Sequence, residues 1–110
     1  MNIDELYNKL VKAGETWSDL DAAATLLEET KKVVLADLKR IIVTEYSGTL
    51  SDAAATTIAL QGDKYKAHIK LMVEARQEAN RAKVQYYGMQ TYVELYRTEQ
   101  STRRADMELR

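Results

Sequence analysis

The chain has 110 residues, 45 % of them hydrophobic, with no proline and four glycines, so long stretches can form regular structure without interruption. It has no cysteine, which excludes disulfides, thiolate metal sites and cysteine nucleophiles. Residues 1–61 hold six Lys and Arg against ten Asp and Glu, whereas residues 62–110 hold ten against seven, so the two halves can attract each other across a hairpin or between protomers.

The first predicted helix covers residues 3–13. Asn2 and Glu5 have the spacing of a capping box, in which each side chain satisfies a backbone N–H of the first turn. Gly14 can adopt the left-handed conformation that ends a helix. The apolar residues between them form one stripe at helical spacing, namely Ile3, Leu6, Tyr7, Leu10 and Val11.

The second predicted helix covers residues 17–47. It begins near Thr16 or Ser18, each followed three residues later by an aspartate that complements the positive end of the helix. Gly48 marks its end. The apolar stripe consists of Leu20, Ala24, Leu27, Val34, Leu38 and Ile41. About 29 residues of helix span roughly 43 Å, more than a small globular core needs.

Two further helices are predicted, a short one at 51–61, capped by Ser51, and a long one at 63–105. Gly62 and Asp63 separate them. Along the long helix, apolar and small residues recur at alternating spacings of three and four, which is typical of a coiled-coil seam. This predicted seam contains Tyr65, His68, Met72, Ala75, Ala79, Ala82, Tyr86, Met89, Val93 and Tyr96.

The pattern predicts an all-α fold, a long antiparallel helical hairpin of coiled-coil type. A short N-terminal helix precedes it and a short helix lies in the connection. Residues 1–110 would form a single helical domain. A second apolar flank of the long helix cannot be covered by the same partner helix and predicts a homo-oligomer, with a dimer favoured. That flank contains Ile69, Val73, Val84, Tyr87 and Leu95.

Few residues have the pattern of a catalytic or metal site. His68 lies in the seam, where a packed histidine explains it better than a general base or a lone metal ligand. Glu74 and Glu78 lie four residues apart and could hold a divalent metal together with Glu28 or Glu29. Alternating charges with i, i+4 ion pairing also explain these acids. The serines have no His and Asp arranged around them. We therefore predict no catalytic residue, no metal ligand and no cofactor.

The segment from residue 96 to residue 104 is the strongest candidate for nucleic-acid contact. Tyr96, Arg97 and Arg104 lie near one another on a helix, and Arg103 adds a further positive charge. Such residues can grip phosphates or stack on bases. The alternative is that Tyr96 is a seam residue and that the arginines pair with neighbouring acids.

Several segments resemble a group of small helical bacteriophage and prophage proteins of uncharacterised function. They are the stretch from Tyr92 to Met107, the helix from Tyr65 to Gln90 with Glu74-Ala75-Arg76, and the run from Ser51 to Ala55. The similarity extends over roughly residues 30–107. It implies a phage or prophage origin and work near recombination or early genes, and it carries no catalytic residues.

We expect a non-enzymatic helical interaction protein that binds an unidentified protein partner as an oligomer. The first alternative is a DNA-binding accessory protein of phage recombination or replication, and the second is a carboxylate–metal hydrolase. No apolar run reaches the ~18 residues of a membrane span, and the acidic start differs from a signal peptide. We therefore expect a cytoplasmic protein without a membrane partner.

Overall fold

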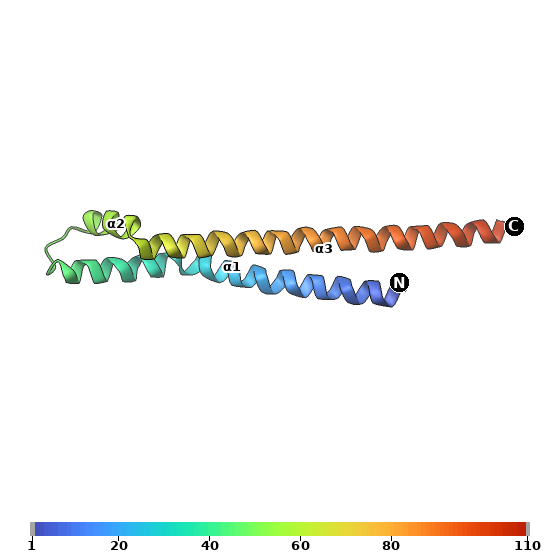
Figure 1. Cartoon of the computed structure of the whole chain (residues 1–110), viewed down its shortest axis with the longest axis horizontal. Helices are drawn as coiled ribbons and strands as arrows, with labels where there is room; N and C mark the ends of the chain where they lie inside the picture. The colour runs from blue at the N-terminus through green and yellow to red at the C-terminus, as the bar shows by residue number, and fades with distance from the viewer. Residues whose placement is uncertain (1, 110) are drawn as a thin grey trace. The chain divides into compact units, whose positions relative to one another are not determined.

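The computed structural model describes residues 2–109, and it confirms the predicted all-α class. The chain forms α1 (Ile3–Glu45), α2 (Asp52–Gln61) and α3 (Asp63–Leu109), which contain 43, 10 and 47 residues (Figure 1). Contacts divide the chain into two compact units. Unit 1 consists of Met1–Leu20 and Glu78–Arg110, and unit 2 consists of Asp21–Gln77. Both α1 and α3 contribute a segment to each unit.

The predicted break at Gly14 is wrong, because α1 continues through this residue to Glu45 without a separate helix at 3–13. The glycine faces the ring of Tyr86, and a Cβ atom at position 14 would stand 3.2 Å from Cε2 of that ring. The Thr16 hydroxyl donates to the Lys12 carbonyl at 3.0 Å, so it bonds back into α1 and does not cap a new helix. Close packing explains this glycine better than a helix end.

Most of the other predicted helix ends agree closely with the structure, but α3 continues past the predicted end at residue 105 to Leu109. Asn2 Oδ1 accepts from the Glu5 N–H at 2.8 Å, and Ser51 Oγ accepts from the Ala54 N–H at 3.2 Å. After α1 the backbone turns left-handed at Ser47 (φ 58°) and Gly48 (φ 75°), where glycine has no steric penalty. The Gly48 N–H donates to the Val43 carbonyl at 2.9 Å and satisfies one carbonyl of the last turn.

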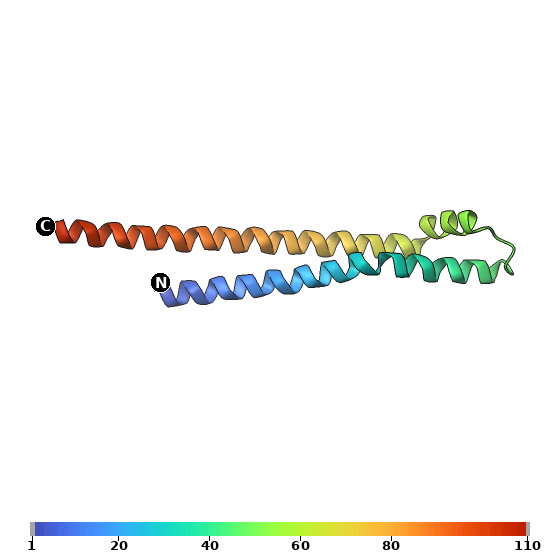
Figure 2. The same cartoon turned by 180° about the vertical axis from the view of Figure 1, so that it is seen from behind.

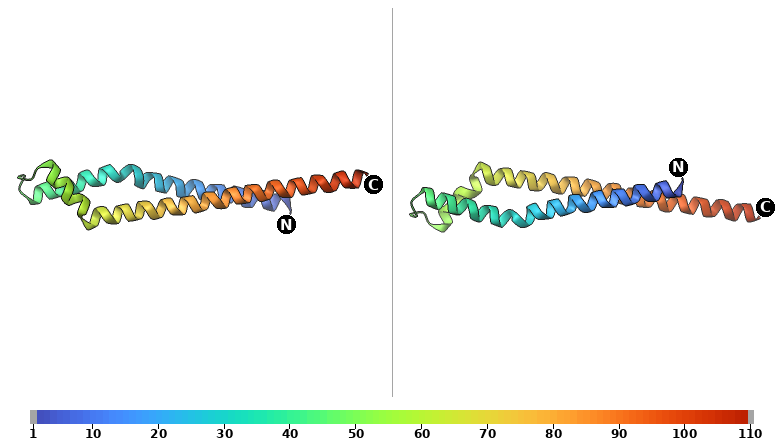
Figure 3. Two further views of the ribbon diagram at one scale, coloured as in Figure 1. Left: turned by 90° about the horizontal axis from the view of Figure 1, so that it is seen from above. Right: turned by 90° about the horizontal axis from the view of Figure 1, so that it is seen from below.

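In unit 2, the second part of α1 and the first turns of α3 run antiparallel, and α2 lies beside the last turns of α1 (Figure 3). Ala55 and Ala59 of α2 are buried, as is Tyr65 near the start of α3. Lys39 Nζ lies 2.8 Å from Asp52 Oδ1 and joins α1 to the first turn of α2. Small side chains therefore let the short helix pack closely.

In unit 1, the first turns of α1 lie beside the second half of α3 in antiparallel direction, and the last turns of α3 continue past the start of α1 (Figure 2). Leu6 of α1 and Ala79, Ala82 and Val93 of α3 are buried here. Among the described residues, no large side chain is fully buried. The interface between α1 and α3 in unit 1 is thus narrow and formed by few buried side chains.

The predicted seam of α3 can be followed in the burial of its residues. Those that the structure buries are Tyr65, Ala79, Ala82 and Val93. Those that it half-buries are His68, Met72, Ala75, Tyr86, Met89 and Tyr96.

Candidate functional site

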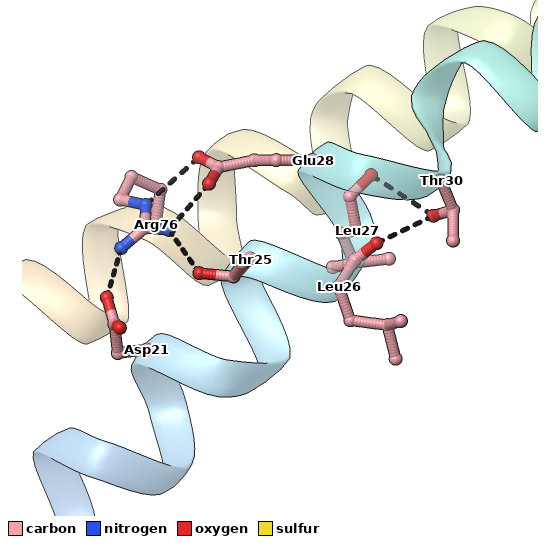
Figure 4. A network of polar contacts seen from close by, with 7 residues as sticks. All are labelled: Asp21, Thr25, Leu26, Leu27, Glu28, Thr30 and Arg76. Atoms are coloured by element: carbon pink, nitrogen blue, oxygen red, sulfur yellow. Dashed lines mark hydrogen bonds and ion pairs between the residues drawn. The ribbon is translucent and has the colours of Figure 1, made fainter.

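The densest group of polar contacts lies in unit 2 around Arg76 of α3 (Figure 4). Its guanidinium donates from Nε to Glu28 Oε2 at 3.0 Å and from Nη2 to Glu28 Oε1 at 2.6 Å. Nη1 donates to Asp21 Oδ1 at 2.6 Å, and Nη2 also reaches Thr25 Oγ1 at 3.2 Å. Asp21, Thr25 and Glu28 lie on one face of α1 because they are four and three residues apart. The two-pronged Arg76–Glu28 pair fixes both distance and direction between the helices.

The charges of this group stabilise one another. The hydrogen bonds from Arg76 lower the pKa of the Glu28 carboxyl below its ordinary value of 4.5. In return, the bonds to Glu28 and then Asp21 raise the pKa of Arg76 above its ordinary value. The side chains are partly open to water, so the group sets the register of α1 against α3 more than it adds stability.

Two of the four carboxylates considered for a metal site, Glu28 and Glu74 of unit 2, form ion pairs instead. Glu28 binds Arg76, and Glu74 lies 3.9 Å from Lys70 Nζ along its own helix. Among residues 2–109, no three His, Asp or Glu side chains gather in a way that could hold a metal ion.

His68 is half-buried in unit 2, and its Nε2 lies 3.0 Å from the carbonyl oxygen of Leu27. A carbonyl only accepts, so Nε2 must carry the proton in this contact. The same carbonyl also accepts from the Thr30 hydroxyl at 3.2 Å. His68 therefore serves as a contact between α3 and α1.

Unit 1 contains a cluster of three aromatic side chains, Trp17 of α1 with Tyr86 and Tyr87 of α3. The ring centroids lie 5.4 to 5.6 Å apart in tilted and edge-on arrangements, which aromatic rings favour. Lys83 Nζ lies 6.0 Å from the centroid of the Trp17 ring. The cluster holds the Tyr86 ring against Gly14.

At the start of α1, unit 1 has an open cleft of about 470 Å³ lined by Asn2, Ile3, Tyr96, Arg97, Gln100, Ser101 and Arg104. Three of the four predicted contact residues therefore meet in one place. The fourth, Arg103, lies outside the cleft and pairs with Glu99 at 2.8 Å. Within the part of the chain that the structure describes, neither Arg97 nor Arg104 forms an ion pair. Between residues 2 and 109, the predicted pairing of these arginines with nearby acids is thus found for Arg103.

In unit 1, α3 carries a long row of uncharged residues outside its main line of contact with α1, although one of them, Tyr87, also packs against Trp17 of α1. They recur at spacings of three and four, so they lie along one face of the helix. We call this row the uncharged stripe, and it consists of Asn80, Val84, Tyr87, Thr91, Leu95, Thr98, Thr102, Ala105 and Leu109. All nine residues are exposed. Val84 and Leu95, with 71 % and 64 % exposure, are large apolar side chains that no part of unit 1 covers.

Comparison with the models of known protein families, with curated proteins and with solved structures finds no match. In the described range of the chain, none of the helices combines the length and the apolar character of a membrane span.

The sequence pattern did not predict the contacts of Arg76, nor most residues of the uncharged stripe. The spacing of Asp21, Thr25 and Glu28 is a usable signal for the group, because three acceptors on one helix face suit an arginine on a facing helix. The signal for the stripe is that charge is missing from one face, which a search for apolar residues alone detects only at Val84, Tyr87 and Leu95.

Proposed function

We propose that the chain is a non-enzymatic helical interaction protein that works as an oligomer and binds a protein partner. The observation that carries the proposal is the uncharged stripe. Exposed helix faces of a monomer normally carry charges, and a row of uncharged and apolar residues of this length is typical of a contact surface.

The composition of the interior supports the same proposal. Five of the eight buried apolar residues in the described part of the chain are alanines, whereas sixteen larger apolar side chains are exposed. Burial of large apolar side chains is the main favourable contribution to folding, and α1 and α3 place much of theirs in water. A chain of this kind gains stability when another polypeptide covers these side chains.

The finer architecture belongs to the proposal as well. We propose an antiparallel helical hairpin of coiled-coil type. Its support is that the seam positions of α3, spaced by three and four residues, are all buried or half-buried.

The test is a pair of charges placed in the stripe. In Val84→Glu/Leu95→Glu, both replaced side chains are exposed, so the helix content by circular dichroism should stay unchanged. Sedimentation equilibrium should show an oligomer for the natural chain and a monomer for the variant. Leu71→Glu is the matched control, since Leu71 is also exposed but lies outside the stripe. An unaltered association in the double variant would contradict the proposal.

A second candidate is a DNA-binding accessory role, and the observation that favours it is the cleft at the start of α1. Arg97 and Arg104, which form no ion pair with any described residue, lie there beside Tyr96, and such residues together can bind phosphates and stack on bases. The modest basic excess of residues 62–110 points the same way.

A further inference from the structure

The uncharged stripe has charged residues along both of its edges, and their signs follow an order. Along one edge, Arg81 precedes Glu99, and along the other, Lys83 precedes Glu94. Each edge is therefore positive toward the start of the stripe and negative toward its end. If a second α3 lies beside the first in the opposite direction, the positive end of each edge therefore meets the negative end of the same edge in the second copy.

One antiparallel register pairs uncharged residues along the stripe and opposite charges along both edges at the same time. If Val84 faces Leu95 of a second copy, Tyr87 faces Thr91 and Asn80 faces Thr98, so uncharged residues meet uncharged residues. In the same register Arg81 meets Glu99 of the second copy and Lys83 meets Glu94. The midpoint of every one of these pairs falls between residues 88 and 90.

Gly88 lies within two residues of every one of these midpoints, and no contact among the described residues requires a glycine there. A Cβ atom added at Gly88 would have no neighbour within 4 Å, unlike one at Gly14. Glycine in the middle of a helix costs stability relative to alanine. A missing side chain at the centre of a helix crossing allows two backbones to approach closely.

A parallel arrangement fits the charges poorly. When two helices pack in parallel, a residue on one edge of the first helix faces a residue five positions further along on the opposite edge of the second helix. Glu94 of one copy would then face Glu99 of the other. Like charges held together in this way oppose association. In the single chain, Glu99 pairs with Arg103 and Lys83 lies near Trp17, but the Glu99–Arg103 pair is exposed and weak, so it does not prevent a new one.

We infer that the uncharged stripe binds the same stripe of a second copy of this chain, antiparallel and centred beside Gly88, with Arg81–Glu99 and Lys83–Glu94 pairs between the copies. The inference rests on the proposed function, because it names the occupant of the surface that the proposal identifies.

Engineered cysteines test the direction and the register, since the chain has no other thiol. We would prepare Val84→Cys and Leu95→Cys separately, mix them, and measure disulfide-linked dimers by mass spectrometry in a glutathione buffer. In the inferred register the two different cysteines face each other. Two copies of Val84→Cys would hold their thiols about 16 Å apart along the helices, beyond the roughly 7 Å that a disulfide spans between Cα atoms.

The expected result is cross-linking in the mixture and little in either variant alone. Leu71→Cys mixed with Leu95→Cys measures cross-linking by random collision. Efficient cross-linking of each variant with itself would indicate parallel pairing and overturn the inference, and so would cross-linking no greater than that of the Leu71→Cys control.

A charge variant gives a second, independent measurement. Glu94→Lys places two lysines opposite each other in the antiparallel register and should weaken dimerisation about tenfold. Lys83→Glu/Glu94→Lys should restore it. A parallel pair would instead be strengthened by the single change.

If the cysteine and charge results fail while Val84→Glu/Leu95→Glu still abolishes association, the inferred register is wrong and the proposed function stands. If that variant has no effect, both are wrong.

Discussion

Gly14 of α1 lies directly against the ring of Tyr86 of α3, with only 3.2 Å between Cε2 and the place where a Cβ atom at position 14 would stand. This distance is shorter than ordinary van der Waals contact, so any side chain here must push the ring away. The ring has little freedom to move, because Trp17 and Tyr87 pack against it with centroids 5.4 and 5.6 Å away. Gly14, a residue type that often ends a helix, therefore serves here to let α1 and α3 pack closely.

Gly14→Ala should therefore fail to give the stabilisation that alanine usually brings to a helix interior. The usual gain is about 1 kcal/mol in the free energy of unfolding, and Gly88→Ala should show it because position 88 opens into free space. Both variants would be unfolded with urea at a concentration low enough for the chain to be a monomer. An equal gain in the two variants would mean that the Tyr86 ring is not held in place.

These two glycines show what sequence alone can and cannot predict. Both Gly14 and Gly88 lie within long helices, and they differ in that Tyr86, far along the chain from Gly14, packs against Gly14 while no described residue packs against Gly88. The position of Tyr86 is a matter of tertiary packing, which overrides the local tendency of glycine to end a helix. Gly48, in contrast, was predicted correctly, since a left-handed turn after the last apolar position depends on neighbouring residues alone.

The same distinction applies to the candidate site. The spacing that placed Ala79, Ala82 and Val93 in a seam is a local property of one helix, and these three residues are buried. The partners of Arg76 lie more than forty positions away, on a helix whose register against α3 no local pattern defines. The sequence therefore indicated Glu28 only as a possible metal ligand beside Glu74 and Glu78, and it predicted no contact for Arg76.

Ala79→Glu should be strongly destabilising. Ala79 has 1 % exposure, so its replacement buries a carboxylate without a partner or forces the helices apart. We expect a loss of about 3 kcal/mol or more in the free energy of unfolding. Gln85→Glu is the control, because the side chain at this position is exposed and should change stability by less than about 0.5 kcal/mol. Equal stability of the two variants in thermal unfolding would refute close contact at Ala79.

Glu28 should make stability depend on pH in the acidic range. Its pKa in the folded chain is below the ordinary value of 4.5 because Arg76 binds the ionised form. A carboxyl with a lowered folded pKa contributes its stability fully above pH 4.5, and the contribution disappears as the pH falls through the folded pKa. Urea unfolding between pH 7 and pH 3 should therefore show a smaller acid loss in Glu28→Gln than in the natural chain. Glu29→Gln, which alters the neighbouring exposed carboxyl, should leave the acid loss unchanged, and a parallel course for all three proteins would contradict the role of the pair.

The cleft at the start of α1 gives the last prediction. If Arg97 and Arg104 bind phosphates, affinity for DNA should fall steeply as salt rises, since each neutralised phosphate releases counterions. Arg97→Ala/Arg104→Ala should then weaken binding at least about tenfold and flatten the salt dependence by about two charges. The matched control is Arg103→Ala, which removes an arginine that already pairs with Glu99 outside the cleft. Fluorescence anisotropy with single- and double-stranded oligonucleotides at several salt concentrations measures both quantities. The cleft is excluded as a nucleic-acid site if no DNA binding is found at low salt, or if Arg103→Ala weakens binding as much as Arg97→Ala/Arg104→Ala does. The interaction role would then be the better explanation of the chain.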